Sequence, residues 1–310
     1  FWYFSTHDSG SALASFDARA KRMAAERKPK TAGAEEFRAT VCATSPCILV
    51  EAGGLSFVFG AGEGAAEGMQ KLGLMRGDID GVVLDDLTLD SIAGLPALRE
   101  ASFAAGRSTP LAVFGPEGVV PVVDGTNLLL SGSAAPEAAK LAAGNEGEDQ
   151  GIDGKIVFDS GVVTIRGFAT APKGRLYRVD FGGKSLIVAG CGATSEDVAR
   201  AAHGTRQPFA VVGAASETLR KAEREAARAA GLAAPEEAAC LTAGEAAKAM
   251  SEGKIAAGLL APLYPQMADS LTRQVWRDEV FPPKGVRLAP AGPGAVLDLS
   301  RAEPSITLPH

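Results

Sequence analysis

The sequence predicts an α/β protein built as a four-layer α/β/β/α sandwich, in which two packed β-sheets carry helices on both outer faces. Two observations lead to this prediction. Short apolar runs typical of buried strands occur in both halves of the chain, and amphipathic helical segments are interleaved with them. Alanine and glycine are abundant while aromatic residues make up only 6% of the chain. Helices must therefore pack on the sheets mainly through small side chains.

The first half of the chain alternates strands and helices. The apolar runs predict strands at residues 37–42, 48–51, 55–59, 81–84 and 111–114. Helical patterns predict helices at residues 63–72 and 91–105. Residues 119–154 are less regular and are expected to form two helical segments, 119–130 and 136–143, and an acidic, glycine-rich loop at 145–153.

The second half repeats this alternation. Its apolar runs predict strands at residues 155–158, 162–169, 176–181, 185–189, 209–212, 256–260, 286–288 and 295–299. Helices are expected at residues 195–202, 216–230, 243–252 and 266–280. The two runs of strands supply the two sheets of the sandwich, so that residues 37–310 are expected to form one domain.

Residues 1–36 are expected to lie outside this domain, as a tether. The aromatic run from Phe1 to Phe4 has the composition of a membrane–water interface, although a ragged terminus would look the same. Behind it, residues 10–30 predict a basic amphipathic helix, and residues 28–33 a linker. We expect membrane attachment upstream of Phe1 and a periplasmic location, or otherwise a cytoplasmic one; the basic residues between 19 and 30 weigh against the periplasmic orientation.

The net charge indicates which kinds of partner the chain can bind, and the cysteines bear on its cellular compartment. A net charge of −6 and a pI near 5.3 predict that the chain binds no nucleic acid. None of the four cysteines (Cys42, Cys47, Cys191 and Cys240) has the spacing of a zinc site. Cys42 and Cys47 flank a short loop, where they either form a disulfide in an oxidising compartment or remain two small buried thiols.

The most informative stretch is residues 81–96, GVVLDDLTLDSIAGLP. It predicts a buried strand, a polar loop and a helix that begins near Asp90 or Ser91. This stretch resembles the metallo-β-lactamase superfamily, in the branch of the tRNase Z and arylsulfatase-like hydrolases. That branch has a His-x-His-x-Asp-His motif followed by Ile-x-Gly-Leu-Pro, and a later Gly-Pro-x-Gly turn that is matched by residues 115–118. The resemblance covers residues 37–299, and it implies a variable insert at about 119–154.

The resemblance implies that the family's metal site is degenerate here. The three histidines of the motif fall on Asp86, Thr88 and Ser91, and only Asp90 keeps its motif identity. The remaining ligand positions fall on residues of other types, at Gly60, near residues 169–171, at Cys191 and at Pro262. The chain's three histidines stand elsewhere, at His7, His203 and His310.

Hydrolysis with two zinc ions needs imidazole and carboxylate ligands around both metals. We therefore expect no bound metal, no cofactor and no catalytic residue, and we expect a catalytically inactive binding or structural subunit that has a protein partner. One alternative is a hydrolase with a Mg²⁺ or Ca²⁺ site made by Asp85, Asp86 and Asp90. Against that alternative, Thr88 or Asp90 could cap the following helix while the other carboxylates face water. A second alternative is a small-molecule binding protein that uses the vacated pocket.

Overall fold

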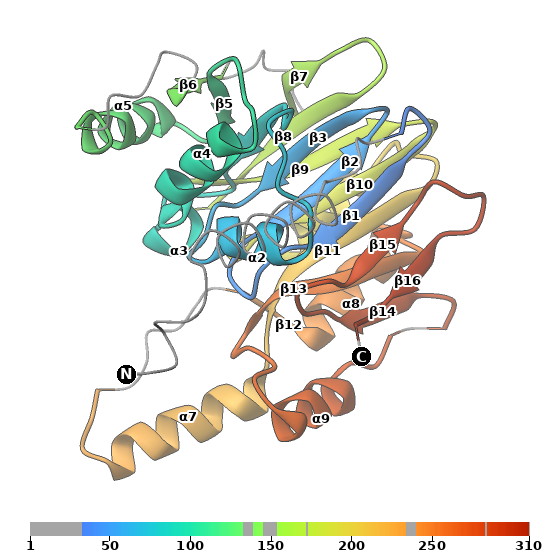
Figure 1. The fold of residues 1–310 in the computed structure, drawn as a ribbon. Helices are drawn as coiled ribbons and strands as arrows, with labels where there is room; N and C mark the ends of the chain where they lie inside the picture. Colours follow the sequence, from blue (N-terminus) through green and yellow to red (C-terminus); the bar gives the residue numbers. More distant parts are fainter. Residues whose placement is uncertain are drawn as a thin grey trace, which may run out of the picture.

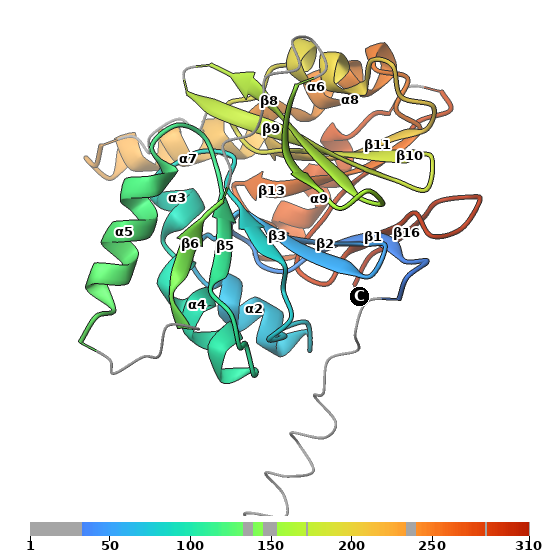
Figure 2. The same cartoon turned by 90° about the horizontal axis from the view of Figure 1, so that it is seen from above.

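The computed structural model describes residues 33–132, 139–144, 154–171, 173–233, 240–282 and 284–309. Two eight-stranded sheets pack face to face, and helices cover the outer face of each sheet (Figures 1 and 2). The predicted four-layer sandwich is confirmed. Within the described ranges, no helix has the length and apolar character needed to cross a membrane.

Sheet A contains both ends of the described chain. Its strand order is β16-β15-β1-β2-β3-β4-β5-β6. Strands β16 to β3 pair in antiparallel fashion, whereas β3 to β6 are parallel. The strands are β1 (Phe37–Val41), β2 (Ile48–Ala52), β3 (Leu55–Phe59), β4 (Gly81–Val83), β5 (Leu111–Phe114), β6 (Leu141–Ala143), β15 (Val296–Asp298) and β16 (Ser305–Thr307).

Sheet B is formed by the middle of the chain, in the order β14-β13-β11-β10-β9-β8-β7, with β12 paired to β11. Strands β7 to β10 form an antiparallel meander, and β10, β11, β13 and β14 are parallel. All eight residues of β11 are buried, as the continuous apolar run of a central parallel strand predicts. The strands are β7 (Lys155–Asp159), β8 (Thr164–Thr170), β9 (Gly174–Phe181), β10 (Lys184–Ala189), β11 (Pro208–Ala215), β12 (Leu241–Thr242), β13 (Ala257–Tyr264) and β14 (Arg287–Pro290).

The helices divide between the two outer faces. Sheet A is covered by α2 (Ala65–Lys71), α4 (Leu95–Ala104) and α5 (Val119–Leu129), with the single turn α3 (Leu89–Ile92) before α4. Sheet B is covered by α6 (Ser195–Ala202), α8 (Ala243–Glu252) and α9 (Ser270–Glu279). Helix α7 (Glu217–Ala229) buries none of its residues and extends away from the body of the molecule (Figure 1).

Three apolar clusters fill the three spaces between the four layers. Phe57, Tyr177 and Leu259 belong to the cluster between the sheets. Met69 belongs to the cluster under the helices of sheet A, and Trp276 to the cluster under those of sheet B. Small residues allow close approach between layers: on α2, a Cβ added at Gly68 would overlap the carbonyl oxygen of Cys42. This contact agrees with the packing expected from the alanine and glycine content.

Several element boundaries differ from the prediction. Residues 141–143 form strand β6 rather than the end of a helix, because they pair in parallel with β5. The Asn127 side chain also donates to and accepts from the Leu141 backbone, at 2.9 Å each. The helix expected over residues 91–105 is two helices, since the Gly94 N–H bonds to the Ala61 carbonyl at 2.7 Å. Strands β12 and β16 were not predicted. Residues 1–32 of the expected tether, with the helix at 10–30, and the loop at 145–153 lie outside the described residues.

Candidate functional site

The predicted site positions lie where parallel strands of both sheets end. Asp86, Thr88, Asp90 and Ser91 follow β4, Gly60 follows β3, Cys191 follows β10 and Pro262 lies near the end of β13. Hydrogen bonds join the two sheets at this edge: the Arg175 N–H donates to the Asp85 carbonyl at 2.7 Å, and the Tyr177 hydroxyl donates to the Leu84 carbonyl at 2.7 Å. The strand connections therefore bring the predicted positions to one edge of the sandwich.

Asp85 holds the most perturbed carboxyl group of this edge. Its carboxylate presses against Gly190, where an added Cβ would overlap Oδ2. Its Oδ1 is closed off from water and has no hydrogen-bond partner among the described residues, although the residue as a whole keeps some exposure. Burial, together with the neighbouring charge of Asp86, raises the pKa of Asp85 to about 7, against hydrogen bonds that include one from Ser91. This carboxyl group is therefore partly protonated near neutral pH.

The Asp86 carboxylate and the Thr88 side chain are hydrogen-bonded to each other. The Thr88 N–H and Oγ1 both donate to Asp86 Oδ1, at 2.8 and 2.6 Å. Thr88 is the N-cap of α3 by position, but neither it nor Asp90 makes a side-chain capping bond, so the predicted cap is wrong. The reason is that the Thr88 hydroxyl turns back to Asp86. Asp90 is exposed in the first turn of α3.

The neighbouring positions leave no room for a longer side chain. Gly60 has a φ of 75°, and a Cβ there would lie 2.8 Å from both Cβ and O of Pro46. An acidic side chain at this position would require the backbone to move. Ser91 is buried, and its carbonyl accepts from the Ala61 N–H at 2.8 Å.

Both cysteine pairs are joined as disulfides. Cys42 and Cys47 close the turn between β1 and β2 with their Cα atoms 5.3 Å apart. Of the two alternatives that the sequence left open, the structure therefore has the disulfide and not two buried thiols. Cys191 is bonded to Cys240, with their Cα atoms 4.1 Å apart. Sequence reasoning missed this second pair because the two residues are 49 positions apart and follow no motif.

Tyr264, which ends β13 two residues after Pro262, is a site residue that sequence reasoning missed. Burial raises the pKa of its phenol, and the charges of Asp90, Asp85 and Asp86 raise it further. The phenol therefore lies within electrostatic reach of all three carboxyl groups and stays protonated. Its position at the end of a buried strand was the available signal in the sequence.

The residues of this edge do not fit a metal centre of the type that the resemblance implies. Among the described residues, no group of three or more His, Cys, Asp and Glu side chains is arranged to hold a metal ion. Asp85, Asp86 and Asp90 accordingly do not form the carboxylate-only set that the first alternative requires. His203 is exposed at the end of α6, and His7 and His310 lie outside the described residues.

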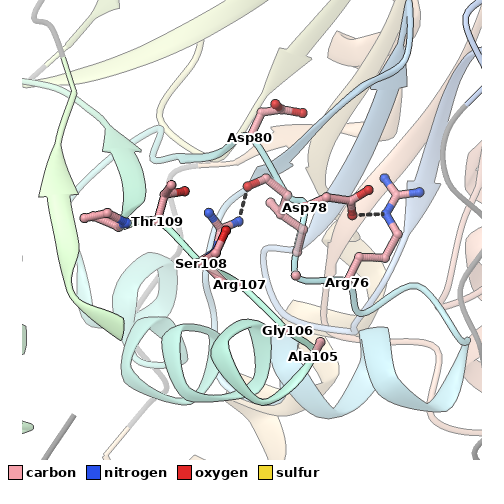
Figure 3. Close-up of a pocket in the computed structure, with 11 residues that line it drawn as sticks. Arg76, Asp78, Asp80, Ala105, Gly106, Arg107, Ser108 and Thr109 are labelled. Atoms are coloured by element: carbon pink, nitrogen blue, oxygen red, sulfur yellow. Dashed lines mark hydrogen bonds and ion pairs between the residues drawn. The ribbon is translucent and has the colours of Figure 1, made fainter. Parts of the chain in front are cut away.

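Two of the hollows formed by the described residues lie close to the sandwich. The larger, of about 600 Å³, is at the opposite end of β4 and contains none of the predicted positions. Figure 3 shows Arg76 beside Asp78, and the distance from Arg76 Nε to Asp78 Oδ1 is 3.2 Å. The Arg107 guanidinium donates to the Ile79 carbonyl. These arginines hold the loops around the hollow together. The smaller hollow, of about 330 Å³, includes Pro262.

Solved structures and a curated protein are similar to this chain, while no protein-family model matches it. Human tRNase Z, short form, superposes with a TM-score of 0.58 at 14% identity, covering 84% of this chain and 98% of that one. The metallo-beta-lactamase fold protein YhfI from Bacillus subtilis gives 0.57 at 14% identity, covering 85% and 99%. Ribonuclease BN of Cronobacter sakazakii is 30% identical over 112 residues, which are 36% of this chain and 34% of the ribonuclease.

The match to the ribonuclease spans about a third of the length of that curated relative, and the solved structures are too distant in sequence to show more than a shared fold. Their architecture agrees with the two packed sheets and outer helices described above. The chain has the metallo-β-lactamase fold, with hydrolases among the proteins it is similar to.

Proposed function

We propose that this chain is a catalytically inactive protein of the metallo-β-lactamase fold that serves as a binding subunit for a protein partner. The Cys191–Cys240 disulfide carries the proposal. It stands where the resemblance expects the aspartate that bridges two metals. A sulfur atom held in a disulfide is not a thiolate, so Cys191 supplies neither a metal ligand nor a nucleophile while the bond is intact.

The other positions support the same conclusion. Asp86 Oδ1 is occupied by two hydrogen bonds from Thr88, and Pro262 has no ligand atom in its side chain. Asp85 is buried and its pKa of about 7 keeps a fraction of it neutral, which weakens it as a cation ligand. No step of metal-assisted hydrolysis can be assigned to this set of residues.

Exposed aliphatic side chains on α5 support a protein partner. Leu128 and Leu129 are adjacent at the end of the helix, and Val120, which is 44% exposed, lies in its first turn. Leu128 and Leu129 remain 74% and 72% exposed, and Leu89 on α3 remains 75% exposed. Clustered apolar side chains of this kind mark protein contacts more often than single exposed ones do. Helix α5 also lies at the start of the expected insert.

The cysteines support a location in an oxidising compartment. The structure pairs all four, and disulfides persist mainly outside the reducing cytoplasm. We therefore propose a periplasmic location for this chain. A chain of net charge −6 supports a partner that is protein rather than nucleic acid.

The proposed loss of hydrolysis is tested by metal analysis and activity. The full chain is purified, incubated with zinc, dialysed, and assayed for metal content and for hydrolysis of a phosphodiester and an ester substrate. We expect no retained zinc and no turnover. One or two zinc ions per chain, or hydrolysis that zinc increases, would overturn the proposal. Thermal stabilisation by Mg²⁺ or Ca²⁺ that is lost in Asp86→Asn would instead establish the carboxylate site.

The proposed partner face is tested by the size of the native assembly. Wild-type protein in gently prepared extracts is expected to elute well above the 31.6 kDa of one chain. The double variant Leu128→Asp/Leu129→Asp should elute at the size of one chain, because charge on this face opposes burial. Leu232→Asp, at an exposed leucine beyond α7, is the matched control. An assembly that survives the double variant, or a wild type that is monomeric, contradicts the proposal.

A further inference from the structure

We infer that the smaller hollow is a binding site for a small amphiphilic anion, with an apolar body and one carboxylate or phosphate group. The hollow has a volume of about 330 Å³ and lies between α9, the end of β13, the turn after β1 and the segment that joins β14 to β15. This volume is at the lower end of the range of small-molecule sites. The inference does not depend on whether the chain has a protein partner.

The walls of the hollow are predominantly apolar. They include Pro262 and Leu263 from β13, Met267 from the connection to α9, and Leu308 near the C-terminus. Thr44 and Gln266 add neutral polar groups. A ligand that entered would exchange water for hydrocarbon along most of its length, which favours an aliphatic or aryl body.

All the charged side chains that line this hollow are positive. Its lining includes Arg273 and Arg277, one helical turn apart on α9, and contains no aspartate or glutamate. Neither guanidinium lies within ion-pair distance of a described carboxylate, although the charge of Arg273 helps to lower the pKa of Asp269, one turn earlier at the start of α9. In a chain whose net charge is −6, two neighbouring arginines without such partners are left available to an anion. The fork of N–H donors on each matches a carboxylate or a phosphate.

The wall opposite α9 is held in place by both sheets. The Ala291 N–H donates to the Leu260 carbonyl of sheet B at 3.0 Å, and the Gly294 N–H donates to the Val41 carbonyl of sheet A at 2.8 Å. The segment between them lines the hollow through Ala291, Gly292 and Pro293. A wall fixed on both sides keeps the hollow open without a ligand, so binding costs little ordering of the chain.

Calorimetric titration of the purified full chain tests the inference with four probes: octyl phosphate, octanoate, octanol and inorganic phosphate. Octyl phosphate and octanoate are expected to bind, and octanol and inorganic phosphate to bind at least about tenfold more weakly, because each lacks one of the two required parts. Arg273→Gln/Arg277→Gln should weaken binding of both anions about tenfold or more. Leu308→Gln should weaken the binding of both anions by a smaller factor.

The matched control is Arg206→Gln. Arg206 is also exposed and makes no ion pair with a described residue, but it precedes β11 and so lies at the opposite edge of sheet B. Circular dichroism checks that each variant is folded. Equal weakening by Arg206→Gln, binding of inorganic phosphate as tight as that of octyl phosphate, or no binding of either amphiphile would each overturn the inference. A difference between octanoate and octyl phosphate identifies the preferred head group.

Discussion

Among single residues, Asp85 is the one whose charge the fold tolerates least. Its carboxylate is enclosed by Gly190 and by the loop after β4, and Oδ1 lacks a hydrogen-bond partner in the described structure. The protein bears this cost at neutral pH, when a water-exposed aspartate would be fully ionised without penalty. A carboxyl group in this state makes the stability of the domain depend on pH.

The direction of that dependence follows from the raised pKa. Between the unfolded value of 3.8 and the folded value of about 7, the folded chain holds a proton on Asp85 that the unfolded chain releases. Stability contributed by this group is therefore fully present at acidic pH and falls as pH rises toward 7. Asp85→Asn should remove this slope and raise the free energy of unfolding at pH 8 by about 1–3 kcal/mol, a range reduced for the partial exposure of the residue.

Urea unfolding at a series of pH values measures this effect. Asp124→Asn, at an exposed position of α5, serves as the control and should leave the profile unchanged. An Asp85→Asn protein that keeps the wild-type slope between pH 4 and 7 would show that another group titrates there.

The sequence located part of this site and not the rest, for a physical reason. Asp86, Cys191 and Pro262 were placed together because the resemblance puts the family's ligand positions on them, and in the structure each lies at or near the end of a strand. The closure of Asp85 Oδ1 by Gly190, and the pairing of Cys191 with Cys240, depend on distances between segments far apart in the chain. No local pattern records such distances.

Among the elements, β2 contains the most demanding interaction. Glu51 is 1% exposed, and its two carboxylate oxygens lie 2.9 Å from Arg76 Nη1 and 2.5 Å from Arg38 Nε. The ion pairs link β2 to β1 and to the loop before β4. A buried charge of this kind is stable only while its partners remain, because removal of one partner leaves the others uncompensated.

Glu51→Gln should therefore lower the free energy of unfolding by about 3–5 kcal/mol, since it removes the buried counter-charge of Arg76 and leaves the exposed Asp78 beside that guanidinium. The exposed Glu67 of α2, which pairs with Lys71 at 4.0 Å, is the comparison: Glu67→Gln should change stability by less than about 0.5 kcal/mol. Thermal and urea unfolding of the two variants check the difference. Similar small losses in both would mean that water reaches the Glu51 network.

The elements that the sequence predicted well are those with long periodic patterns. Helix α8 and the buried core of β11 were expected close to where they lie. Strands β6, β12 and β16 have two or three residues each, and they become strands only through pairing with β5, β11 and β15. A segment of that length has no periodicity of its own. Its conformation is set by the neighbouring strand.

For the whole molecule, the two disulfides should contribute unequally. The Cys42–Cys47 bond closes a loop of sequence separation 5, and the Cys191–Cys240 bond one of 49. Loop-closure entropy predicts about 2 kcal/mol for the first and about 4 kcal/mol for the second, as upper estimates. Urea unfolding of the two Cys→Ala double variants, under oxidising conditions, measures both. A greater loss for the short loop would point to its complete burial, rather than to chain entropy, as the dominant effect.

The strand order of sheet A affects folding during synthesis of the chain. Strand β1 lies between β2 and β15, and Arg38 pairs with Asp298 across nearly the whole length of the chain. As synthesis proceeds from the amino end, one edge of β1 stays without its hydrogen-bond partner until residues 296–298 leave the ribosome. An open edge of this kind pairs readily with other chains. We therefore expect the nascent protein to depend on chaperones until residues 296–298 emerge, with that demand set by the topology of sheet A.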